Sequence, residues 1–236
     1  MNKHSKQLAG LSADFNHHDL AYSIVKPFGP SILETKIPDS IFGSFLKLSD
    51  TLLNDSDRRS YGKYLVGQIK EEAYIPREML QDFGVYKYIE TMFAEYVLGV
   101  SYVNAEPSYQ AAVRSAQSSS RYSNPIAVTI DAAWLVDQKP EEYNPIHNHS
   151  GATLSSVLYL RVPPSAGHDP RTGKPSLDGQ IEWVSTGAVD LQNSTVRVAP
   201  KAQYFYIFPS SLMHLVYPYR GGGERVSIAI NASFRQ

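Results

Sequence analysis

The chain has 236 residues, 42% of them hydrophobic and 19% charged, so it is long enough to bury a sizeable core. A formal net charge of −1 gives no global basic field, so nucleic acid is not expected as a partner. The absence of cysteine excludes disulfides, thiolate ligands, iron–sulfur clusters and a cysteine nucleophile. Any metal must therefore be held by histidine, carboxylate or other oxygen ligands, which suits iron, manganese or zinc.

The N-terminal part carries two helical patterns. Behind Pro38-Asp39-Ser40, apolar residues recur at helical spacing and predict a helix over about residues 39–54. The same spacing predicts a helix over Tyr86 to Val100, whose aromatic side chains are expected to pack in the core. Weaker patterns predict a solvated terminal segment over residues 1–25, a turn with a strand over 26–36 and a short strand over 64–69. A helical turn is predicted over residues 76–83, and residues 108–124 fit a loop, a helix or a strand.

From Ile126 onward the sequence is rich in β-branched and aromatic residues, as strands are. Runs of this kind, separated by turn signals, predict strands over residues 127–136, 154–161, 180–184, 195–198, 203–208, 214–218 and 225–232. Many short strands at this spacing indicate a sandwich, barrel or jelly roll, and no long crossover helix fits between them. We predict a mainly β, α+β protein: one domain, 1–236, in which a helix-containing part, 1–125, packs on a double-stranded β-helix (jelly roll), 126–236.

Three histidines of this region have the layout of a metal site. His147 and His149 are two residues apart, so in an extended chain their imidazoles point to the same side. His214 follows Phe208-Pro209-Ser210 on a distant predicted strand, which a jelly roll could bring to the same place. Three ligands on one side of an iron leave the opposite side open for a bidentate co-substrate and dioxygen.

A candidate carboxylate clamp lies further along the chain. Arg225 and Ser227 are two residues apart on a predicted strand, so their side chains point the same way. A planar guanidinium beside a hydroxyl is suited to bind a carboxylate in a bidentate manner. The distal carboxylate of a 2-oxo dicarboxylic acid would require such a clamp.

On these motifs, the chain from Trp134 to Asn231 resembles the iron(II)- and 2-oxoglutarate-dependent dioxygenases, specifically the prolyl-hydroxylase-like subgroup found in phages and marine bacteria. The resemblance is carried by His147-Asn148-His149, the apolar run 154–160, Phe208-Pro209-Ser210 with His214, and Arg225-Val226-Ser227 with Asn231. It implies that His147 and His214 bind Fe(II) and that Arg225, assisted by Ser227, binds the C5 carboxylate of 2-oxoglutarate. Tyr159 and Tyr206 are weaker candidates for the same carboxylate.

The resemblance also implies an activity. With Fe(II), 2-oxoglutarate and O2, the enzyme would hydroxylate an unactivated C–H bond, and the metal site would need no further catalytic side chain. The implied acceptor is a prolyl residue in a peptide or protein, or free proline. Polar residues 1–10 and the absence of a long apolar run lead us to expect no membrane partner and a cytoplasmic location, the host cytoplasm if the protein is phage-encoded.

One residue departs from the pattern of the superfamily. Its usual triad is His-x-Asp/Glu with a distant His, and His149 stands at the carboxylate position. The spacing favours His149 as the third ligand. In one alternative, a separate carboxylate, such as Asp131, Glu142 or Glu182, is the third ligand. In the other, His149 points at the substrate and water fills the third position.

Two other functions remain open at this point. A three-His cupin-type dioxygenase would use no 2-oxoglutarate, and Arg225 would then bind a substrate carboxylate directly. In a jelly-roll lectin or phage structural component, these histidines would bind zinc or no ligand at all.

The long loop over about residues 163–179 is a separate candidate feature. If the protein is an enzyme, this loop is long enough to act as a lid over the site.

Overall fold

The computed structural model describes residues 13–17, 20–25, 29–104, 126–185, 187 and 193–235. The helices are α2 (Asp39–Asn54), the 3-10 helix η1 (Gly62–Tyr64), α3 (Arg77–Asp82) and α4 (Tyr86–Val103). The strands are β1 (Ala13–His17), β2 (Leu20–Val25), β3 (Ile32–Lys36), β4 (Glu71–Tyr74), β5 (Ala127–Gln138), β6 (Asn144–His147), β7 (Leu154–Arg161), β8 (Ile181–Val184), β9 (Thr195–Val198), β10 (Tyr204–Pro209), β11 (Met213–Val216) and β12 (Arg225–Arg235).

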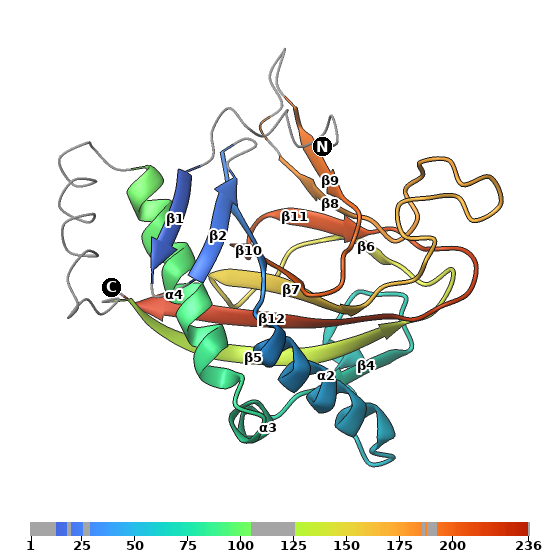
Figure 1. Cartoon of the computed structure of the whole chain (residues 1–236), viewed down its shortest axis with the longest axis horizontal. Helices are drawn as coiled ribbons and strands as arrows, with labels where there is room; N and C mark the ends of the chain where they lie inside the picture. The colour runs from blue at the N-terminus through green and yellow to red at the C-terminus, as the bar shows by residue number, and fades with distance from the viewer. Residues whose placement is uncertain are drawn as a thin grey trace.

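The strands form two antiparallel sheets (Figure 1). One sheet has eight strands in the order β1-β2-β3-β10-β7-β12-β5-β4, and the other has four in the order β6-β11-β8-β9. Side chains of both sheets pack in one buried cluster, which includes Tyr159 from β7, Phe208 from β10 and Trp183 from β8. The C-terminal half is therefore a double-stranded β-helix, and the prediction of a mainly β jelly roll with N-terminal helices is confirmed.

Helices cover the outer face of the eight-stranded sheet (Figure 1). Alternation along β12 separates its two faces: Val226 and Ile228 pack in the helix-covered cluster, whereas Arg225 and Ser227 line a pocket on the jelly-roll side. Both faces are buried, as in a strand between two layers. Burying an aliphatic side chain such as Ile228 contributes about 1.5–3 kcal/mol to the stability of the fold. A slip by one residue would move these side chains to the other face of the strand, so their burial fixes the register that directs Arg225 inward.

The N-terminal part contributes strands to the sheet as well as helices. Residues 13–17 and 20–25 pair as β1 and β2 and join the sheet through β3, so the expectation of a solvated terminal segment was wrong there. Residues 64–69 are not a strand: η1 ends at Tyr64, and Gln68 makes only an isolated bridge to Tyr143. β1 and β2 pair with each other and β2 pairs with the next strand, β3, whereas Gln68 bridges to a residue far along the chain.

Two further expectations can be set beside the structure. The undecided stretch 108–124 lies outside the described residues. Within the described part of the chain, no helix is long and apolar enough to cross a membrane.

Candidate metal centre

The antiparallel pairing of β6 and β11 brings two histidines together. His147, the last residue of β6, is the direct cross-strand partner of His214 on β11. Their ring centroids are 4.3 Å apart, with 50° between the ring planes. Cross-strand partners have neighbouring side chains, so the backbone register itself creates this pair.

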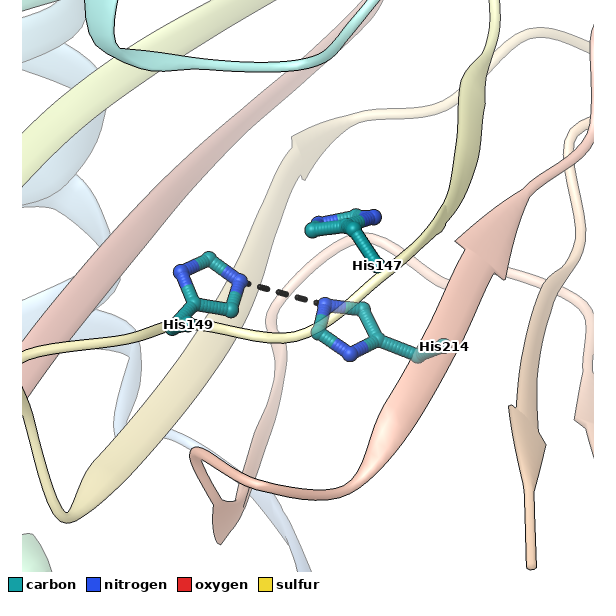
Figure 2. A group of neighbouring side chains, drawn as sticks. All are labelled: His147, His149 and His214. Carbon is teal, nitrogen blue, oxygen red and sulfur yellow. Dashed lines mark hydrogen bonds between the residues drawn. The ribbon is translucent and has the colours of Figure 1, made fainter. Parts of the chain in front are cut away.

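His149 reaches the same point from the turn that follows β6 (Figure 2). Its backbone N–H donates to the carbonyl of Ser210 at 2.9 Å, and Ser210 Oγ donates to the carbonyl of Ala152 at 2.6 Å. Ser210 thereby joins the turn carrying His149 to the end of β10. The serine of the Phe208-Pro209-Ser210 motif thus has a structural role in positioning the third histidine.

The backbone determines which ring nitrogen of two histidines is free. The Nδ1 of His147 lies 2.7 Å from the carbonyl of Pro145, and that of His214 lies 2.9 Å from the carbonyl of Leu212. A carbonyl oxygen can only accept, so each Nδ1 carries the proton and each Nε2 presents a lone pair. This arrangement orients metal-binding histidines.

The free nitrogens are grouped closely enough to share one ion. Nε2 of His149 and Nε2 of His214 are 3.2 Å apart, and ligand atoms of all three histidines lie within 4.8 Å of one another. Two ligands about 2.1 Å from a metal and at right angles to each other would be about 3.0 Å apart. The spacing therefore fits a common metal ion, and imidazole donors suit iron or zinc.

Burial keeps the imidazoles neutral. Desolvation lowers the pKa of His149 to about 4 and that of His214 to about 3, with smaller contributions from the neighbouring histidines. Burial also lowers the pKa of His147. At neutral pH the three rings can therefore bind a cation without first losing a proton.

The three carboxylates considered as alternative ligands are engaged elsewhere. Asp131 accepts a hydrogen bond from Ser233 Oγ, and Glu182 forms an ion pair with Arg197 at 2.8 Å. Glu142 accepts hydrogen bonds from the backbone N–H groups of two lysines, Lys70 and Lys139. Among the described residues, the one group of three or more potential metal ligands is His147, His149 and His214.

Arg225 lines the same pocket as the histidines. It is 2% exposed, and its Nη1 donates to Gln138 Oε1 at 2.6 Å. Its Nε and Nη2 are buried without a hydrogen-bond partner in the described structure. Burial lowers the pKa of this guanidinium, and no carboxylate pairs with it within that same part of the chain. Two adjacent unpartnered donors fit a bound carboxylate, so the residues present suit 2-oxoglutarate.

The other predicted clamp residues, Ser227, Tyr159 and Tyr206, are all buried but have different neighbours. Ser227 is buried and lines the pocket beside Arg225. The ring of Tyr159 lies under the guanidinium, 5.2 Å from ring centroid to Cζ, and its buried hydroxyl has no hydrogen-bond partner in the described structure. Tyr206 packs against Trp183 in the aromatic cluster, with ring centroids 5.7 Å apart, and does not line the pocket. Neither tyrosine lines the pocket, and the one whose ring contacts Arg225 among the described residues is Tyr159.

Sequence reasoning missed the N-terminal contribution to this pocket. Leu65 and Val66 line it, as does the buried Glu72 of β4. The loop 163–179, considered as a lid, contributes no residue to the pocket lining, and its Asp178 is held by Arg220 at 2.5 Å. No local pattern could have revealed the role of residues 65–72, because it depends on β4 pairing with β5.

Comparisons with known proteins give a family match and several structural neighbours. Residues 132–231 match the family model described as "Putative 2OG-Fe(II) oxygenase". A prolyl-4-hydroxylase from Pseudomonas putida is 14% identical, with a TM-score of 0.50 and coverage of 87% of this chain and 92% of that one. A prolyl hydroxylase from Trichoplax adhaerens, solved with a hypoxia inducible factor peptide fragment, is 14% identical, with a TM-score of 0.50 and coverage of 87% and 83%.

A 2OG-Fe(II) oxygenase family oxidoreductase from Burkholderia pseudomallei is 15% identical, with a TM-score of 0.35 over 46% of each chain. A search of curated proteins found no match. The family match covers β5 to β12, the region that holds the three histidines and Arg225. Residues 132–231 therefore match the 2OG-Fe(II) oxygenase family, and the chain's structural neighbours include prolyl hydroxylases.

Proposed function

We propose that the protein is an Fe(II)- and 2-oxoglutarate-dependent dioxygenase that hydroxylates an unactivated C–H bond. One observation supports this above all: a three-histidine cluster and a buried arginine with two unpartnered donors line the same pocket. A metal at one end and a carboxylate clamp at the other are what a chelating 2-oxo dicarboxylic acid requires.

The chain's own residues have distinct roles in this proposal. His147, His149 and His214 would hold Fe(II), which when bound supplies the oxygen chemistry needed to attack a C–H bond. Arg225 and Ser227 bind the C5 carboxylate of 2-oxoglutarate and thereby orient its 2-oxo acid end toward the histidines. Apolar side chains of the lining exclude water from the site; they include Val136, Ile181, Phe208 and Val216.

His149 changes the charge of the site. Three neutral imidazoles leave a bound Fe(II) one unit more positive than two imidazoles and a carboxylate would. The two negative charges of bound 2-oxoglutarate would offset the extra positive charge of this site. Co-substrate binding is therefore expected to strengthen metal retention.

The proposed acceptor is a prolyl residue of a peptide or protein, or free proline. Support comes from two structural neighbours, which are a prolyl-4-hydroxylase and a prolyl hydroxylase in complex with a peptide. Incubation with proline-containing peptides and free proline, followed by mass spectrometry, tests the acceptor. Addition of one oxygen atom to the acceptor, in step with succinate release, is the expected result.

The reaction class is tested by turnover of the purified protein with Fe(II). Succinate release that requires both 2-oxoglutarate and dioxygen is expected. Oxygen uptake without 2-oxoglutarate would instead identify the three-His cupin-type dioxygenase, the second candidate, which the histidine at position 149 favours. If neither activity is found, the remaining candidate is a non-catalytic binding or structural module.

A further inference from the structure

Glu72 is a buried carboxylate in the pocket of the three histidines. It lies on β4, opposite Val136 of β5, and is 4% exposed. It lines the pocket together with the histidines and Arg225, yet none of the roles above uses it. Burying a carboxylate is costly unless a cation or hydrogen-bond donors compensate for its lost hydration.

Such compensation is missing among the described residues. Their hydrogen bonds and ion pairs include none to the Glu72 carboxylate, and no lysine or arginine contributes to the pKa shift of this group. Arg58 pairs with Glu71 at 2.8 Å, and Lys139 pairs with Asp137 at 2.7 Å. Burial, with a further contribution from Glu142, raises the pKa of Glu72 to about 7. This corner of the pocket therefore lacks a positive charge.

The carboxylate lies beneath a loop that forms part of the pocket lining. A Cβ added to Gly62 would be 3.6 Å from Glu72 Oε2, and one added to Gly67 would be 3.5 Å from Oε1. Gln68 donates its backbone N–H to the carbonyl of Tyr143 at 2.8 Å, which ties the loop to the chain just before β6. Leu65 of this loop lines the pocket, so Glu72 lies under an apolar cover where a cation would be strongly attracted.

Among the described residues, no hydrogen bond or ion pair joins the Glu72 carboxylate to Arg225 or to one of the three histidines. The charge that raises its pKa, besides burial, is that of Glu142, and neither Arg225 nor a histidine contributes. Conversely, the pKa shifts of His149, His214 and Arg225 have no contribution from Glu72. A molecule in contact with Glu72 in this pocket would share it with the three histidines and Arg225.

We propose that Glu72 binds a positively charged group of the acceptor, so that the enzyme acts on a cationic acceptor. The proposal rests on the proposed function, because it names the substrate class of that site. Two sources supply such a charge: a basic side chain beside the target residue of a peptide, or the free amino group of a small acceptor such as proline. The carboxylate would accept a charge-assisted hydrogen bond from either.

Binding to the Fe(II) protein with 2-oxoglutarate, measured anaerobically by calorimetry, tests this without turnover. One pair of probes is acetyl-Ala-Lys-Pro-Lys-Ala-amide and the same peptide with glutamine for lysine. The other pair is L-proline and N-acetyl-L-proline. We expect the cationic member of one pair to bind at least about tenfold more tightly, as a hydrogen bond to a charged group predicts.

Three variants assign this preference to Glu72. Glu72→Gln is expected to remove it, and Glu72→Asp to keep part of it. Glu71→Gln is the matched control, because Glu71 is on the same strand, paired with Arg58 and outside the pocket lining. Equal binding within both pairs, no binding of any probe, or a preference that survives Glu72→Gln would overturn the proposal. If Glu72→Gln does not fold, the proposal is still tested by the binding of the two probe pairs to the wild type and to Glu72→Asp.

Failure of this inference can be told apart from failure of the proposed function. Succinate release with no charge preference would refute the role of Glu72 alone. A charge preference that depends on Glu72, without succinate release, would refute the reaction class and leave the cation site in place.

Discussion

His147 and His214 are direct partners across the β6–β11 ladder, and their ring centroids are 4.3 Å apart. Both rings are oriented by a hydrogen bond from Nδ1 to a backbone carbonyl two residues earlier. The two proposed ligands are therefore fixed by strand register and backbone contacts. His149, in contrast, depends on the turn that Ser210 holds.

His147→Ala and His214→Ala are each expected to abolish retention of Fe(II). Disturbing a residue that merely orients a ligand costs about 10–100-fold in metal affinity, so loss of a ligand itself should exceed about 100-fold. Metal content after gel filtration measures this. His168→Ala is the control, because His168 is exposed and lies outside the pocket lining. Wild-type metal content in either ligand variant would contradict the assignment.

His149 can be tested by two substitutions with opposite outcomes. His149→Ala should lower Fe(II) affinity, because it removes one of three donors. His149→Asp should retain the metal, because it restores a carboxylate at the position where the superfamily has one. Full iron occupancy in His149→Ala would show that this residue is no ligand.

The central site was predictable to the extent that its signals are local. The spacing of His147 and His149, and the alternation that directs Arg225 inward, follow from strand geometry. The contribution of Glu72 was not predictable, because it depends on β4 pairing with β5 and on the link from Gln68 to Tyr143. Such contacts join segments far apart in sequence, and no pattern within either segment indicates its partner.

Arg225 should control binding of 2-oxoglutarate. Removing one partner of a buried, hydrogen-bonded charge pair costs about 2–5 kcal/mol, so Arg225→Ala should weaken 2-oxoglutarate binding by about 30-fold or more. Arg225→Lys should recover part of the affinity, because it keeps the charge but loses the planar pair of donors. Anaerobic titration of the Fe(II) protein measures both, and an unchanged affinity in Arg225→Ala would refute the clamp.

Ser210 should influence the metal through the turn that carries His149. Ser210→Ala removes the hydrogen bond from Oγ to the carbonyl of Ala152, which contributes about 1 kcal/mol to stability. The loosened turn should also lower Fe(II) affinity. Ser233→Ala is a suitable control, because it removes an exposed hydrogen bond to Asp131 and leaves the turn intact. Equal metal affinity in the two variants would mean that Ser210 does not position His149.

Glu72 should make the free energy of unfolding depend on pH. Its pKa is raised from 4.5 to about 7 in the folded chain, so between these values the unfolded state loses a proton that the folded state keeps. Stability therefore falls as pH rises from about 4.5 to about 7, by up to about 3 kcal/mol at 1.36 kcal/mol per pKa unit. Glu72→Gln removes this loss, so its stability relative to the wild type should increase over that range. Urea unfolding of both proteins at several pH values measures the difference, and a difference independent of pH would show that the carboxylate is not desolvated in the folded protein.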